Sequence, residues 1–110
     1  MQIEKKDKYT LISSDENTLE AFQNSLLEKI NDFENAHLIL HICKKINVKD
    51  KDFSLILEIA ENKQEKNTSV VIINADLNLD NFPEHINIAP TMQEAEDILE
   101  MEAIERELGF

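Results

Sequence analysis

The sequence predicts an α/β fold, with an open sheet of four or five strands and about three main helices. Segments with strand-like and helix-like hydrophobic spacing alternate along the chain. Glycine occurs once and proline twice, which is too few for the many corners of a turn-rich β-sandwich. The chain has 110 residues, 42% of them hydrophobic, and shows no repeat or break in composition. We therefore expect a single globular domain over residues 1–110.

The first third of the chain predicts a hairpin followed by a helix. Residues 3–6 and 9–13 are strand-like and flank a polar Lys-Asp-Lys turn. Residues 13–18 then offer several N-cap side chains. The next apolar residues are spaced by 3, 4, 4 and 3, which predicts an amphipathic helix over about 18–33. They are Leu19, Phe22, Leu26, Ile30 and Phe33.

The central elements are a buried strand, a helix and a second strand. Residues 37–43 form a short apolar run, and strand alternation places Leu38, Leu40 and Ile42 on one face. A helix with a wide apolar surface is expected over about 51–63, beginning near Asp50 or Asp52. Residues 69–73 are rich in β-branched side chains, which predicts a strand.

A short strand and a long helix complete the predicted order. The strand is expected at residues 86–88. Thr91 and Glu94 match a capping box, which predicts a helix over 92–108 with Gly109 at its stop.

The charge of the chain is strongly negative and uneven. Eleven basic residues against 23 acidic ones give a net charge of −12. Residues 67–110 contain ten acids and a single base, Arg106, whereas residues 41–66 are close to neutral. Such a field repels phosphate backbones, so direct nucleic-acid binding is disfavoured. The charge favours solubility or a basic protein partner.

The sequence also bears on compartment. No apolar run approaches the ~18 residues of a membrane span, and no signal-peptide core follows Met1. Cys43 is the single cysteine and has no partner in the chain for a disulfide. A cytoplasmic protein without membrane contact is expected.

The residues with catalytic or metal-binding potential form no recognisable site. A chain with one glycine has no glycine-rich phosphate loop. His37, His41 and Cys43 share one predicted strand face, but a half-buried face explains them as well as a metal does. The sequence thus predicts no catalytic residues, no metal and no cofactor.

Two segments resemble a known family. Residues 41–60 read HICKKINVKDKDFSLILEIA and residues 89–95 read APTMQEA. Together with the order of elements, they resemble the STAS family of anti-sigma-factor antagonists and sulfate-transporter tails. The resemblance implies a STAS-like sheet and a non-catalytic protein-interaction module. It also implies a partner of the anti-sigma or kinase-like class.

The family's phosphorylation motif, Asp-Ser-Ser-Gly, is replaced in this chain. The matching positions are Lys49, Asp50, Lys51 and Asp52, with Asp50 where the phosphorylated serine would be. The serine switch is therefore expected to be absent. Asp50 is either a permanent mimic of the phosphate or an ordinary N-cap of the following helix.

The resemblance implies a partner-binding surface at this loop and the following helix. Its charged rim would be Lys49, Asp50, Lys51 and Asp52, and Leu55 and Ile59 would form its apolar centre.

The last helix offers a second surface, because it has more apolar residues than one packed stripe requires. Met101, Ile104 and Phe110 could bind a partner or a second copy, with Glu105 and Glu107 at the rim. The other interpretation is a packed helix with a frayed end.

Residues 93–110 are similar to small Bacteroidetes-type STAS-like proteins that often carry the label ribonuclease Z. This likeness implies an alternative function, as an accessory protein in RNA processing. The His-x-His-x-Asp-His motif of the metal-dependent nuclease is absent, since no two of His37, His41 and His85 are separated by one residue.

Overall fold

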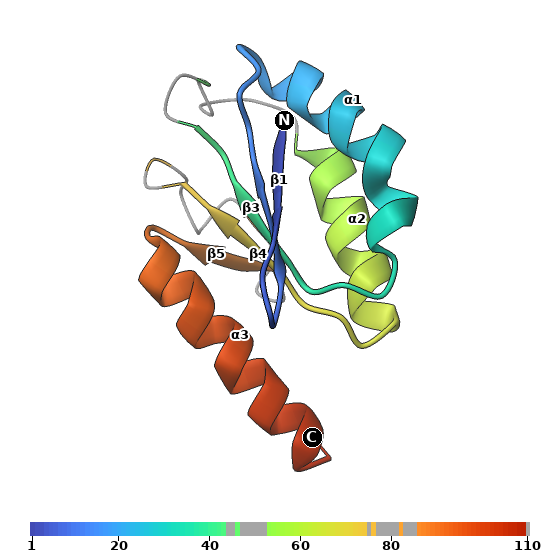
Figure 1. Cartoon of the computed structure of the whole chain (residues 1–110), viewed down its shortest axis with the longest axis vertical. Coiled ribbons are helices and arrows are strands. Elements are labelled where there is room, and N and C mark those ends of the chain that lie inside the picture. Colours follow the sequence, from blue (N-terminus) through green and yellow to red (C-terminus); the bar gives the residue numbers. More distant parts are fainter. Residues whose placement is uncertain (44–45, 47–52, 75, 77–81, 83–85, 110) are drawn as a thin grey trace.

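The computed structural model describes residues 1–43, 46, 53–74, 76, 82 and 86–109. Its strands are β1 (Gln2–Lys5), β2 (Thr10–Ser13), β3 (Leu38–His41), β4 (Val70–Ile73) and β5 (Asn87–Ala89). Its α-helices are α1 (Leu19–Lys29), α2 (Ser54–Glu65) and α3 (Met92–Glu107), and a 3₁₀-helix, η1 (Ile30–Phe33), extends α1. The described residues thus form the predicted α/β fold, an open five-stranded sheet with three main helices (Figure 1).

The strands lie in the sheet in the order in which they occur along the chain. β1 is antiparallel to β2, and every later neighbour pair is parallel. Because the parallel strands advance in one direction and crossovers are right-handed, α1 and α2 must cover the same face. α3 follows the last strand and covers the opposite face (Figure 1).

The two faces of the sheet have separate cores, and β3 contributes to both. Leu38 and Leu40 point toward α1 and α2, into the larger core. Ile39 points the other way and packs with Val71, Ala95 and Leu99 beneath α3. The predicted alternation of residues 37–43 is therefore confirmed, although the hydrogen-bonded strand covers only its middle.

Several predicted turns and caps are confirmed. Lys6 N–H donates to the carbonyl of Tyr9 at 2.8 Å and closes the hairpin. The Thr18 hydroxyl caps α1 at the N–H of Ala21, over 3.1 Å. The Thr91 hydroxyl accepts from the N–H of Glu94 at 3.2 Å. Gly109 follows α3 with φ of 82°, the left-handed conformation that ends many helices.

Two predicted helix ends need correction. The last turn of the predicted first helix is the tighter 3₁₀-helix η1. α2 begins at Ser54, after an N-cap at Phe53 that makes no side-chain cap. Asp50 and Asp52, the predicted starts of this helix, lie outside the described residues.

α3 is the longest of the described helices, with 16 residues. Seven of them are acidic and one is basic. In the part of the chain that the structure describes, no helix combines the length and apolar character needed to cross a membrane.

Candidate functional site

A stripe of three large apolar side chains is exposed on the C-terminal half of α3. Met101 is 62% exposed, Ile104 50% and Leu108 66%. Their spacing of three and four residues places them on one side of the helix. Ala95 and Leu99, which are buried against the sheet, lie on the other side. We call Met101, Ile104 and Leu108 the α3 stripe.

Three polar contacts hold α3 on the sheet. The Tyr9 hydroxyl donates to Oε2 of Glu96 at 3.3 Å. Farther along the helix, the Asn87 side-chain amide donates to Oε2 of Glu102 at 2.7 Å. Near its end, Nη1 of Arg106 donates to Oγ of Ser69 at 2.9 Å. The helix is therefore attached at three levels, while its C-terminal end projects past the sheet (Figure 1).

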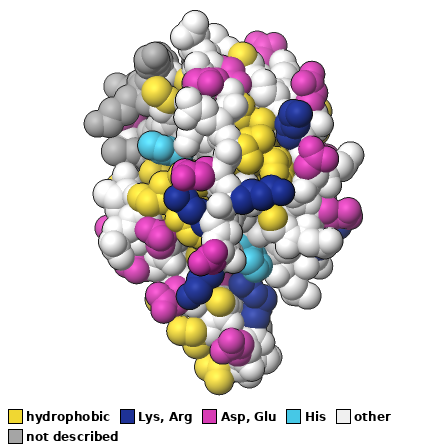
Figure 2. Space-filling view, viewed as in Figure 1, with side chains coloured by type: hydrophobic (Ala, Val, Ile, Leu, Met, Phe, Trp, Pro, Cys, Tyr) yellow, Lys and Arg dark blue, Asp and Glu magenta, His cyan; other side chains and the backbone are white. Residues whose placement is uncertain are grey.

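Acidic side chains flank the α3 stripe on both sides. At 100° per residue, Glu100 and Glu107 lie on one flank and Glu105 lies on the other. All three are exposed. On the projecting end of α3, hydrophobic side chains are seen next to acidic ones (Figure 2). The surface is thus an apolar stripe with a negatively charged border.

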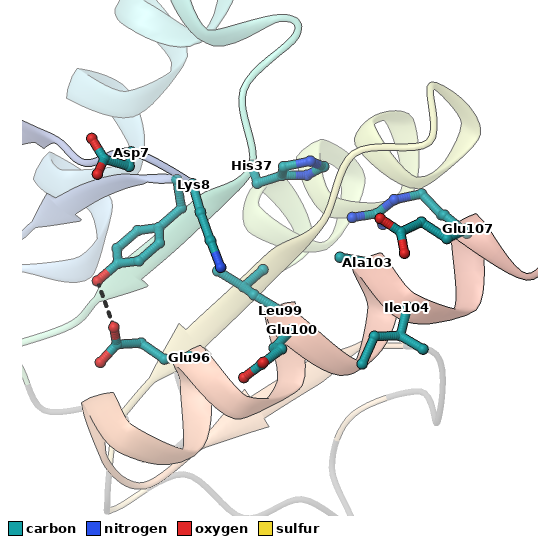
Figure 3. Close-up of a pocket in the computed structure, with 11 residues that line it drawn as sticks. Asp7, Lys8, His37, Glu96, Leu99, Glu100, Ala103, Ile104 and Glu107 are labelled. Atoms are coloured by element: carbon teal, nitrogen blue, oxygen red, sulfur yellow. Dashed lines mark hydrogen bonds between the residues drawn. The ribbon is translucent and has the colours of Figure 1, made fainter.

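A cavity of about 620 Å³ lies between the β1–β2 turn and α3. Lys8 extends from the turn toward the helix, and His37 borders the cavity at the start of β3 (Figure 3). Leu99, Ala103 and Ile104 supply apolar lining from α3. Four carboxylates line the cavity, against two cationic side chains. The carboxylates are Asp7, Glu96, Glu100 and Glu107, and the cations are Lys8 and Arg106.

His37 is neutral in this environment. Its Nδ1 accepts a hydrogen bond from the N–H of Ser69 at 2.9 Å, so the ring proton is on Nε2. Burial lowers the pKa of His37 below its usual 6.5, and the charges of Arg106 and Lys63 lower it further. The negative charge of Glu102 raises the pKa of His37, against these effects. At neutral pH the imidazole therefore adds no positive charge to the cavity.

The surface predicted at the second helix is only partly described. Lys49, Asp50, Lys51 and Asp52 lie outside the described residues. Ile59 is 5% exposed and belongs to the core, whereas Leu55 is half-buried and lines a groove between α1 and α2. Ile59 is therefore not an exposed apolar anchor, because its side chain is buried in the larger core.

The alternative surface on the last helix is described except for its final residue. Phe110 lies outside the described residues, whereas Met101 and Ile104 are exposed. Glu105 and Glu107 border them, as the sequence suggested. Sequence patterns alone did not identify Leu108 as a member of the stripe, or Tyr9 and His37 as lining of the cavity. The signal available for the cavity was Arg106, which is the single base among the ten acids of residues 67–110.

The two histidines and the cysteine predicted to share a strand face lie in β3 or next to it. His37 precedes the strand, and His41 ends it and is exposed. The N–H of Cys43 donates to the Ser14 hydroxyl at 2.7 Å. The described residues contain no group of three or more His, Cys, Asp and Glu side chains placed to hold a metal ion.

Comparison with known proteins gives no family model that matches the chain and no curated protein with significant similarity to it.

Proposed function

We propose that this chain is a non-catalytic protein-interaction module of the STAS type that acts in the cytoplasm without a serine switch. The fold is compatible with a STAS-like open sheet. The observation that carries the proposal is the exposed α3 stripe. Leaving three large apolar side chains in water on one helix face is unfavourable unless another surface covers them.

The binding face of the module is the stripe on α3. Anchors at positions i, i+3 and i+7 are typical of a helix that docks on a partner. The helix is also held to the sheet through Glu96, Glu102 and Arg106, so binding would order few additional groups. The resemblance to the STAS family points to an anti-sigma or kinase-like protein as the partner.

A photo-crosslinking amino acid placed at Met101 tests this function in cells. Leu27, an apolar residue of α1 that is 50% exposed, provides a matched control position. We expect a crosslink to one defined protein from position 101 and none to it from position 27. Equal products from both positions, or no product from position 101, would overturn the proposal. Recovery of a nuclease or tRNA would instead favour the RNA-processing alternative.

A further inference from the structure

The α3 stripe and the cavity beside it form one continuous surface. Ile104 belongs to the stripe and also lines the cavity. Glu100 and Glu107 flank the stripe on the cavity side and belong to the cavity lining as well. A helix lying along the stripe would therefore have the cavity directly at its side.

The cavity is suited to a long aliphatic side chain with a cationic end. Leu99, Ala103 and Ile104 provide apolar contact for such a stem, and lysine and arginine side chains bury their stems in this way. The cationic end of that side chain would meet an excess of carboxylates. Four carboxylates line the cavity against the two cations Lys8 and Arg106, and His37 is neutral.

Charge argues against a second copy of this chain as the occupant. α3 carries seven acids and one base, so two such helices packed along their stripes would bring carboxylates together. Like charges in contact across an interface are unfavourable and exclude wrong partners. The complementary occupant has the opposite pattern, an apolar stripe with a basic border.

On the basis of the proposed interaction function, we infer that the α3 stripe binds a basic amphipathic helix of the partner. That helix inserts a lysine or arginine side chain into the cavity between α3 and the β1–β2 turn. Met101, Ile104 and Leu108 contact the apolar face of that helix. Glu100 and Glu107 pair with its cations.

Synthetic peptides provide the probe. Two helical peptides share one heptad pattern of leucines, and their remaining positions are lysine in one and glutamate in the other. A third peptide keeps the lysines but replaces the leucines by serine. Binding to the full chain is measured by fluorescence anisotropy at several salt concentrations. We expect only the leucine–lysine peptide to bind well, with a Kd that rises as salt is added.

Three variants test the assignment to this surface. The double variant Glu100→Lys/Glu107→Lys should weaken binding at least about tenfold. The control is Glu28→Lys/Glu65→Lys, at exposed positions of α1 and α2. It changes the net charge by the same amount and should weaken peptide binding much less. Ala103→Phe fills the cavity without changing charge and should also weaken binding. Circular dichroism before each titration shows whether a variant is folded, and Ala103→Phe supplies the test if the charge variant is not.

Several results would overturn the inference. One is equal binding of the lysine peptides with and without leucine, which would indicate general polycation attraction. Another is an equal effect of the two charge variants. A third is unchanged binding in folded Ala103→Phe. If position 101 still crosslinks to one protein in cells while these peptides do not bind, the interaction function stands. Only the inference of a basic partner helix is then wrong. Loss of the crosslink removes the function itself.

Discussion

The side chain of Gln23 in α1 accepts a hydrogen bond from the backbone N–H of Ile56 in α2, over 3.2 Å. Ile56 is the third residue of α2, and its N–H is one of the four that lack a partner within the helix. Phe53, at the N-cap position, makes no side-chain cap. A residue 33 positions earlier in the chain therefore performs the capping, and Gln23 is buried to do so.

Replacing Gln23 by leucine should destabilise the protein by about 1–2 kcal/mol, because the buried N–H of Ile56 loses its acceptor. Asn24→Ala, at the exposed neighbouring position, should change stability by less than about 0.5 kcal/mol. Urea denaturation of both variants measures the difference. Equal stabilities would show that the Gln23 contact contributes nothing to the fold.

Substitution by methionine should destabilise the protein more at Lys63 than at Lys66. Lys63 is 4% exposed, and its ammonium donates to the carbonyl of Phe33 at 2.6 Å. Burial lowers the pKa of this ammonium, with a further contribution from Lys66. Lys66 pairs with Glu34 on the surface, where both side chains are more than half exposed.

Lys63→Met should therefore cost about 1–3 kcal/mol, since it removes the hydrogen bonds of a charged donor to the carbonyls of Phe33 and Glu34. The Phe33 carbonyl then keeps its hydrogen bond from the N–H of Ala36. Lys66→Met should cost less than about 1 kcal/mol, because an exposed ion pair is screened by water. Thermal unfolding of the two variants at one pH makes the comparison. A larger loss for Lys66→Met would contradict this assignment.

His37 should make stability depend on pH. Its folded pKa is lowered from 6.5, so the unfolded chain binds more protons in the range between the folded pKa and 6.5. The contribution of His37 is therefore complete above 6.5 and is lost as pH falls through that range. His37→Asn retains an acceptor for the Ser69 N–H and should flatten this part of the profile. Urea denaturation over a series of pH values measures the profile, and an unchanged slope in His37→Asn would contradict this prediction.

The sequence predicted the order and type of the elements because local spacing encodes them. The alternation at residues 37–43 and the cap at Thr91 are examples that the structure confirms. The start of α2 could not be predicted in this way, because its cap comes from Gln23 in α1, which is distant in the sequence. The cavity also depends on contacts between distant segments, such as Tyr9 with Glu96. On α3, hydrophobic spacing in the sequence indicated a second apolar face. On α2, the burial of Ile59 could not be predicted, because it depends on how the helix is rotated against the sheet.

Substitutions at Leu99 and Met101 should distinguish the buried face of α3 from its exposed face by their effects on stability. Leu99 is 8% exposed and packs in the core beneath the helix, so Leu99→Ala should cost about 2–4 kcal/mol. Met101 is 62% exposed, and Met101→Ala should change stability by less than about 0.5 kcal/mol. Urea denaturation followed by circular dichroism measures both. If Met101→Ala destabilised the chain as much as Leu99→Ala, the α3 stripe would belong to the fold, and its exposure would no longer argue for a partner.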